Sequence, residues 1–252
     1  MKSILKVEGV RKFFGGLAAL DGVDMEVPEQ AISMLIGPNG SGKTTLINVI
    51  TGFFKPDDGR VLFNGREITG WTPDRTYDVG IVRTFQIPLP FQKLTVLENL
   101  LTAARVNPGE GFLSAPFKRR WIADEERNAR FAFKILRLLK LDDLWNEEAS
   151  KLSGGQMKLL EIGRALMSEA KMILMDEPIS GVNPVLAHEV LSHIVDLKIE
   201  LGATFLFVEH RLDIAIPYVD RVYAMDKGRI VSQGDAEEVL NDRRVMDAYL
   251  GG

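Results

Sequence analysis

The sequence contains no cysteine, which excludes disulfide bridges and metal sites built from thiolates. No apolar run approaches the roughly 18 residues that a helix needs to cross a bilayer. Residues 1–8 alternate like a strand and lack the apolar stretch of a signal peptide. The net charge of −4 argues against a general nucleic-acid-binding surface. We therefore expect a protein of a reducing compartment that neither crosses a membrane itself nor binds nucleic acid.

The most informative motif is a glycine-rich loop, because residues 37–45 match the phosphate-binding pattern G-x-x-x-x-G-K-[ST]. An apolar, strand-like run precedes the loop and a helical segment follows it, as the motif requires. Glycine lets backbone N–H groups turn inward around a polyanion, and the helix points its positive end at the phosphates. Lys43 then supplies a charge for the β- and γ-phosphates, while the hydroxyl of Thr44 ligates Mg²⁺. The predicted nucleotide-binding residues are Gly37, Pro38, Asn39, Gly40, Ser41, Gly42, Lys43, Thr44 and Thr45.

Charged side chains follow two other apolar runs that have the length of buried strands. The run at residues 171–175 leads into Asp176 and Glu177, and the run at residues 203–208 is followed closely by His210. Carboxylates at the end of a buried strand are costly unless a cation needs them. We expect Asp176 to hold Mg²⁺ beside the phosphate loop, and Glu177 to orient or deprotonate an attacking water. The sequence supports two interpretations of His210 equally. Its side chain contacts the γ-phosphate or the attacking water, or it has no role in the site.

Three weaker candidates remain open on spacing alone. Gln86 ends a strand-like run, where its amide could reach a metal-bound water or occupy an ordinary turn. Phe13 and Phe14 lie in segment 11–16, which interrupts the predicted N-terminal strands before a turn at Asp21-Gly22. A ring there could stack on a base, but spacing favours packing of both phenylalanines inside a β-rich layer.

The remaining patterns indicate how the chain is divided. Strand-like segments dominate residues 1–86, helical patterns fill most of residues 87–152, and strands alternate with helices from residue 153, ending in a helix over about 235–250. We expect an α/β fold, in which a P-loop NTPase core carries an N-terminal antiparallel β-subdomain and an inserted α-helical subdomain. The nucleotide-binding core is assigned to residues 1–86 and 153–252, and the helical subdomain to residues 87–152.

The order of these motifs resembles the ATPase subunit of ATP-binding cassette (ABC) transporters over essentially the whole chain. The most specific motif is the pentapeptide Leu-Ser-Gly-Gly-Gln at residues 152–156, which other phosphate-loop enzymes lack. In that family it binds the γ-phosphate of ATP held by another subunit, using N–H groups at a helix N-terminus. The resemblance therefore implies ATP, Mg²⁺ and a head-to-tail dimer with itself or with a related ATPase subunit. It adds four nucleotide-binding residues, Ser153, Gly154, Gly155 and Gln156.

The same resemblance gives the other candidates their roles. It implies that Phe14 stacks on adenine, where many members have tyrosine, and Phe13 remains the alternative. In the loop after the catalytic glutamate, Asn183 stands where the family usually has aspartate. The implied catalytic residues are Glu177, His210, Gln86 and Lys43, and the implied metal ligands are Thr44, Gln86 and Asp176.

A narrower resemblance is to the ATPase subunits of branched-chain amino-acid importers. It rests on Arg83-Thr84-Phe85-Gln86, on residues 94–100 and 159–166, and on Asn183-Pro184. The resemblance implies that the chain lies at the cytoplasmic face of the cell membrane and powers uptake of these amino acids through two transmembrane permease subunits, with an external solute-binding protein. The alternatives are an ABC ATPase for another solute and a non-transport ABC-type ATPase. A genome-maintenance member would need a long coiled coil, which residues 87–152 do not encode.

Overall fold

The structure, a computed structural model of the chain, describes residues 2–84, 90–105 and 118–250. Backbone contacts divide the chain into two compact units, each with its own packing. The first unit consists of Met1–Gln86, Lys171–Ser180 and Leu197–Gly252, and the second consists of Ile87–Ala170 and Gly181–Asp196.

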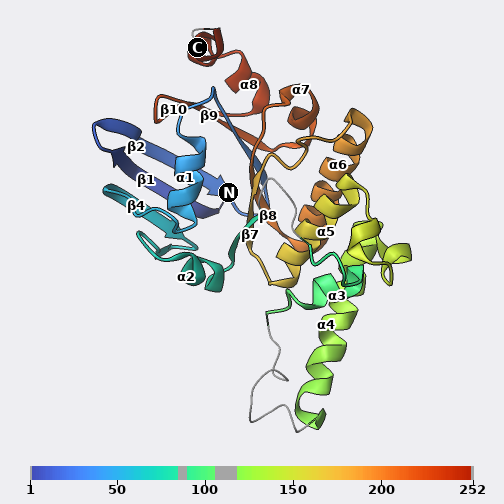
Figure 1. Cartoon of the computed structure of the whole chain (residues 1–252). Coiled ribbons are helices and arrows are strands. Elements are labelled where there is room, and N and C mark those ends of the chain that lie inside the picture. Colours follow the sequence, from blue (N-terminus) through green and yellow to red (C-terminus); the bar gives the residue numbers. More distant parts are fainter. Residues whose placement is uncertain (1, 85–89, 106–117, 251–252) are drawn as a thin grey trace. The chain divides into compact units, whose positions relative to one another are not determined.

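Two sheets form the framework of the first unit (Figure 1). The smaller sheet is antiparallel, with the strand order β2-β1-β4-β5. The larger sheet has the order β10-β9-β3-β8-β7-β6, and only β10, at one edge, is antiparallel to its neighbour. The fold is therefore α/β with an N-terminal antiparallel sheet, as predicted. The strands are β1 (Ser3–Phe14), β2 (Leu17–Pro28), β3 (Ile32–Ile36), β4 (Asp58–Phe63), β5 (Arg66–Glu67), β6 (Ile81–Thr84), β7 (Met172–Asp176), β8 (Thr204–Val208), β9 (Arg221–Asp226) and β10 (Arg229–Gly234).

Helices connect the strands of the first unit and make up most of the second. The first unit has α1 (Lys43–Ile50), α2 (Pro73–Asp78), α7 (Leu212–Ala215), the 3-10 turn η4 (Ile216–Tyr218), α8 (Ala236–Leu240) and α9 (Arg243–Leu250). The second has α3 (Val96–Leu101), α4 (Lys118–Leu138), the 3-10 turns η2 (Asp142–Leu144) and η3 (Ala149–Lys151), and α5 (Gly154–Met167), while α6 (Pro184–Leu201) begins in the second unit and ends in the first. Across the described ranges, no helix combines the length and the apolar character needed to cross a bilayer.

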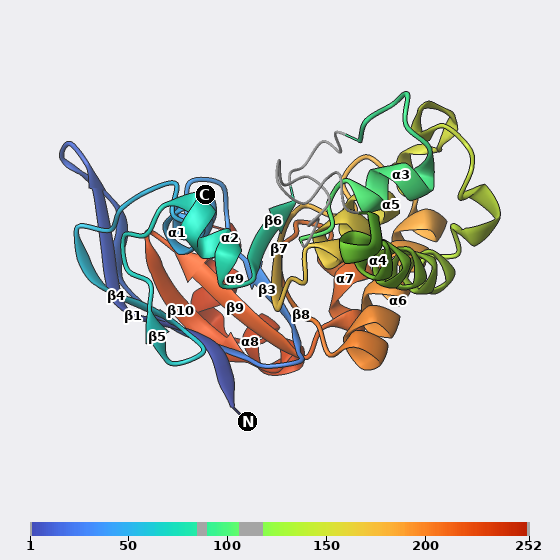
Figure 2. The ribbon, with the colours of Figure 1, turned by 90° about the horizontal axis from the view of Figure 1, so that it is seen from below.

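The predicted helical subdomain is shorter than the second unit, which also takes in residues 153–170 and 181–196. The physical reason is that α5 packs against both α3 and α4 (Figure 2), and the three helices bury apolar side chains such as Leu100, Ile135 and Leu160. Contacts alone do not define a functional domain. The predicted division into domains therefore stays a prediction.

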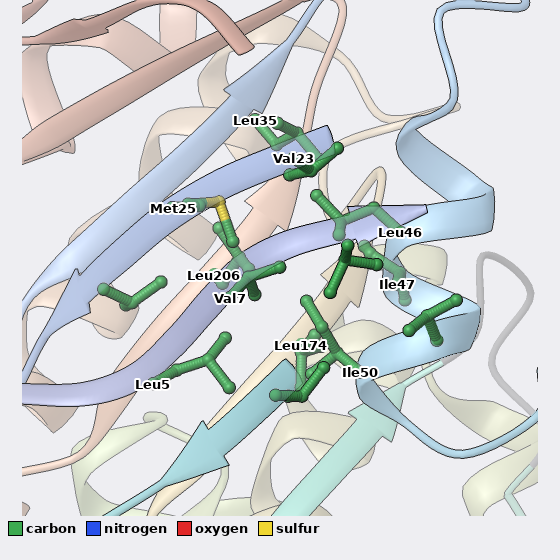
Figure 3. Packing of buried hydrophobic residues seen from close by; sticks show 14 of the residues in the cluster. Leu5, Val7, Val23, Met25, Leu35, Leu46, Ile47, Ile50, Leu174 and Leu206 are labelled. Carbon is green, nitrogen blue, oxygen red and sulfur yellow. The ribbon is translucent and has the colours of Figure 1, made fainter. Parts of the chain in front are cut away.

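The core of the first unit is the layer in which α1 meets both sheets. Figure 3 shows side chains from β1, β2, β3, β7 and β8 converging on one face of α1. Burying each large aliphatic side chain contributes about 1.5–3 kcal/mol. This packing fixes the direction of α1, and with it the direction in which the preceding loop faces. The residues labelled in the figure are Leu5, Val7, Val23, Met25, Leu35, Leu46, Ile47, Ile50, Leu174 and Leu206.

The N-terminal hairpin corrects two predictions. Segment 11–16 does not interrupt the strands, because β1 continues through Phe14 and the turn lies at Gly15-Gly16. The second prediction, a turn at Asp21-Gly22, is wrong as well. Both residues lie inside β2, at a point where the strand register shifts. Gly22 has φ +77°, so it accommodates a β-bulge that bends the strand without reversing it.

Candidate active site

The phosphate loop connects β3 to α1 in the first unit, which is the context that the sequence predicts. Three of its glycines have φ in the left-handed region, with values of +148° at Gly37, +78° at Gly40 and +107° at Gly42. A Cβ on Gly37 would lie 2.1 Å from the carbonyl oxygen of Met225, and a Cβ on Gly42 would lie 2.5 Å from that of Ala19. Backbone angle and crowding therefore both require glycine at these two positions.

The side chain of Lys43 folds back onto its own loop. Its Nζ donates hydrogen bonds to the carbonyl oxygens of Gly37 at 2.7 Å and Pro38 at 2.9 Å, and the residue is 7% exposed. Burial lowers the pKa of Lys43, while the negative charge of Glu177 acts in the opposite direction. Phosphate oxygens are stronger partners for an ammonium than neutral carbonyls. The loop therefore presents a partly desolvated cation that an anion would stabilise.

Glu177 and His210 lie together at the carboxyl ends of two neighbouring parallel strands. Glu177 follows β7, and its backbone N–H donates to the carbonyl oxygen of Val208 in β8 at 2.9 Å. The Nε2 atom of His210 lies 3.6 Å from Oε1 of Glu177, and both side chains are partly exposed. Glu177 has φ +49°, a conformation that a non-glycine residue adopts at a cost and that concentrates at functional sites. The geometry gives the carboxylate an imidazole neighbour and access to solvent water.

Asp176 ends β7 and forms an ion pair with Arg83 of β6, the neighbouring parallel strand. The Nε atom of Arg83 donates to Oδ2 of Asp176 at 3.1 Å, and its Nη1 donates to Oδ1 of Asn48 in α1 at 2.5 Å. The carboxylate therefore does have a cationic partner, as its position requires. A cluster of three or more histidine, cysteine or acidic groups arranged for a metal is absent from the described residues. Mg²⁺ takes few protein ligands when phosphates are bound, so one carboxylate and the Thr44 hydroxyl fit this ion.

The pentapeptide at residues 152–156 opens α5 in the second unit. Ser153 is the N-cap, with its Oγ accepting from the N–H of Gln156 at 3.3 Å and its own N–H donating to Oε1 of Gln156 at 2.9 Å. This reciprocal capping box fixes the first turn of the helix. A Cβ on Gly155 would come within 2.4 Å of the end of the Leu186 side chain, so any larger residue there would force that side chain to move. Gly154 has open space around its Cα, which leaves its backbone accessible.

Phe13 and Phe14 are 44% and 45% exposed near the end of the β1–β2 hairpin. The spacing favoured a prediction that both rings pack inside a β-rich layer, and this prediction is wrong. Phe14 contacts Phe54 edge-on, with ring centroids 5.4 Å apart, and the Nζ of Lys12 lies 5.7 Å from the centre of its ring. An exposed ring supported in this way offers a face for stacking, which stays a prediction. The predicted metal contact of Gln86 lies outside the described residues.

Comparison with known proteins then decides the family. A family model for ABC transporters matches residues 20–180. A protein of Methanocaldococcus jannaschii, named as a probable branched-chain amino acid transport ATP-binding protein LivG, is 52% identical over 98% of this chain and 97% of its own length. The chain belongs to the ABC transporter family.

Further relatives cover the whole length of this ABC family member. The Pseudomonas aeruginosa protein named high-affinity branched-chain amino acid transport ATP-binding protein BraF is 35% identical over 99% of this chain and 98% of its own length. A solved ATP-binding cassette of an ABC transporter, in its ADP conformation, is 51% identical, covers 100% of both chains and superposes with a TM-score of 0.85. ABC transporter ATP-binding proteins are ATPases that bind nucleotide, and this chain is an ATPase of that family.

One buried carboxylate beside the site of this ABC ATPase received no role from its sequence. Glu209 is 2% exposed, and its two oxygens accept hydrogen bonds from the N–H of Ile179 at 2.9 Å and of His210 at 3.1 Å. Burial raises the pKa of Glu209, and these N–H donors lower it in part. The carboxylate thereby ties the loop after Glu177 to the segment that directly follows β8. The rule that found Asp176, an acid at the end of an apolar run, applies equally to Glu209.

Proposed function

We propose that this chain binds ATP with Mg²⁺ at residues 37–45 and hydrolyses it to power an ABC importer of branched-chain amino acids. The observation that carries the proposal is the arrangement of three neighbouring strands, β3, β8 and β7. The phosphate loop, His210 and Glu177 follow their carboxyl ends, which is where ligands collect in open α/β sheets.

Nucleotide binding is assigned to the loop and to the start of α1. The N–H groups of residues 37–45 and the positive end of the helix would surround the phosphates, and Phe14 would stack on adenine. Lys43 would exchange its bonds to the loop carbonyls for the β- and γ-phosphates. Thr44 and Asp176, with Gln86, would hold Mg²⁺, which neutralises phosphate charge and polarises the bond that breaks.

Hydrolysis is assigned to the pair at the strand ends. Glu177 would orient the attacking water and accept its proton, because its carboxylate is partly exposed and its position is set by β7 and β8. His210, 3.6 Å from Glu177, would contact the γ-phosphate or hold the same water. Gln86 and Lys43 complete the proposed catalytic set.

A second ATPase subunit is needed to complete the site. Ser153, Gly154, Gly155 and Gln156 begin a helix whose N–H groups suit an anion, and they would cover ATP held by the partner in a head-to-tail dimer. The partner is a second copy or a related ATPase subunit. Closure of the dimer would move the transmembrane permease subunits of the importer.

The transported solute is inferred from the two curated relatives described above, both of which carry branched-chain amino acid transport in their names. On this proposal the chain works at the cytoplasmic face of the membrane with two permease subunits and receives solute through an external binding protein. Reconstitution with these partners should give ATP-dependent leucine uptake. Uptake of a different solute by the same assembly would support the alternative, an ABC ATPase of another transporter.

The first prediction tests hydrolysis separately from binding. Glu177→Gln should reduce ATP turnover about 10²- to 10⁴-fold, because a positioned general base contributes that much. ATP binding should be retained, and an ATP-stabilised dimer should appear in size-exclusion chromatography. Glu200→Gln, an exposed position on α6, is the matched control and should behave as the wild type. Undiminished turnover in Glu177→Gln would remove Glu177 from the catalytic role.

A further inference from the structure

The C-terminal helix α9 contacts the phosphate loop directly. The hydroxyl oxygen of Tyr249 accepts a hydrogen bond from the backbone N–H of Gly37 at 2.8 Å, across 212 residues of sequence. Gly37 is the first residue after β3, so this N–H lies at the entrance to the loop. Tyr249 is 42% exposed, and desolvation of its hydroxyl by the contact with the loop raises the pKa of that hydroxyl. The hydroxyl is protonated at neutral pH, and its oxygen lone pairs accept the bond from Gly37.

Gly37 joins this contact to Lys43. The carbonyl oxygen of Gly37 accepts a hydrogen bond from Nζ of Lys43 at 2.7 Å, while its N–H is bound to Tyr249. The Cα of Gly37 also lies close to β9, because a Cβ at this position would lie 2.1 Å from the carbonyl oxygen of Met225. The position and orientation of the loop entrance thus depend on α9 as well as on the sheet.

The helix that supplies Tyr249 is itself fixed to the larger sheet. Asp242 precedes α9, and its carboxylate accepts a hydrogen bond from the N–H of Arg244 at 2.9 Å and bonds the side chain of Ser232 in β10. Val245, in the first turn, is 3% exposed, and α9 packs on both β9 and β10. A helix anchored at this end can hold Tyr249 in one place.

We propose that Tyr249 is a positioning residue of the phosphate loop, through which α9 holds Gly37 in the orientation that receives a nucleotide. The inference rests on the proposed binding of nucleotide phosphates at residues 37–45. Without the hydroxyl, the N–H of Gly37 loses its partner at the loop entrance, and the loop samples orientations that must be ordered again when nucleotide binds. The cost falls on binding, because ordering a loop at the moment of association weakens affinity.

The second prediction is the effect of Tyr249→Phe in the full chain. The affinity for MgADP should fall about two- to tenfold, the range expected for one hydrogen bond. The exchange of the amide hydrogens in residues 37–45 should become faster in the nucleotide-free chain. Tyr77→Phe, which removes a hydroxyl from the exposed tyrosine of α2, should change neither quantity.

The measurements are a titration with a fluorescent ADP analogue in the presence of Mg²⁺ and hydrogen exchange read by mass spectrometry. Unchanged affinity and unchanged exchange in Tyr249→Phe, in a chain whose wild type binds MgADP, would overturn the inference and leave the proposed function intact. A wild type that binds no nucleotide would instead overturn the proposed function. A loss of affinity accompanied by faster exchange throughout the first unit would mean that Tyr249 only stabilises the fold, which also contradicts the inference.

Discussion

At the scale of single residues, the charged groups around the proposed site are held mainly by the backbone. Carbonyl oxygens hold the ammonium of Lys43, and N–H groups hold the carboxylate of Glu209. These backbone groups lie in the loops that directly follow β3, β7 and β8, and preorganised backbone dipoles need little reorganisation when charge is added. Asp176 differs, because its partner is a side chain, that of Arg83, which also bonds Asn48. A metal that takes Asp176 must therefore compete with an arginine.

Glu209 gives the third prediction, which concerns the dependence of stability on pH. Burial raises its pKa in the folded chain above the usual 4.5, so protonated Glu209 favours the fold. This contribution is complete below about pH 4.5 and is lost as the pH rises through the raised folded pKa. Since glutamine does not titrate, the unfolding free energy of the wild type minus that of Glu209→Gln should fall as the pH rises.

Urea denaturation at several pH values between about 4.5 and 7.5 measures this difference. Glu200→Gln removes an exposed carboxyl and should give a difference from the wild type that stays nearly constant. A difference for Glu209→Gln that is constant, or that rises with pH, would mean that burial does not control this carboxyl.

At the scale of secondary structure, α3 and α5 of the second unit both begin with a capping box. Thr95 and Ser153 each accept a hydrogen bond from the N–H three residues later, and each is closed by the side chain of that later residue. Alone, the cap contributes about 1 kcal/mol in either helix. The difference proposed here is that the first turn of α5 also faces a nucleotide.

The fourth prediction compares these two caps. Ser153→Ala and Thr95→Ala should each lower the free energy of unfolding by about 1 kcal/mol. Turnover per folded chain should fall only in Ser153→Ala, because only α5 carries the proposed contact with the partner's ATP. Chemical denaturation and steady-state ATPase assays measure the two effects. Equal turnover in both variants would reduce Ser153 to a structural cap.

Sequence patterns predicted the elements well where local chemistry decides them. The apolar runs at β7 and β8 are strands, and the helical pattern within residues 87–152 includes α3, which a capping box at Thr95 opens. The single helix expected at residues 235–250 is two helices, because the helix beginning at Ala236 stops at Leu240 and Asp242 starts a new turn by binding the N–H of Arg244. Local sequence patterns predict helix over residues 235–250, but they do not predict the break between α8 and α9.

At the scale of the whole molecule, the site combines residues that the sequence marks with residues that only the fold brings in. The phosphate loop, Asp176 and Glu177 each carry a signal within a few residues. The ion pair of Asp176 with Arg83 spans 93 residues, and the bond from Gly37 to Tyr249 spans 212. No pattern within one segment contains such contacts, because they depend on which strands become neighbours. They support the residues that the sequence marks.

The central claim is that residues 37–45 hold the phosphates of a nucleotide, and the most direct test is equilibrium binding of MgATP by isothermal titration calorimetry. The wild type should bind, and Lys43→Ala should lose at least about tenfold in affinity, since a charge-assisted contact with phosphate is worth roughly 1.5–3 kcal/mol. Lys55→Ala, an exposed lysine of the same unit, should bind as the wild type. Equal affinity in the wild type and in Lys43→Ala would contradict the claim.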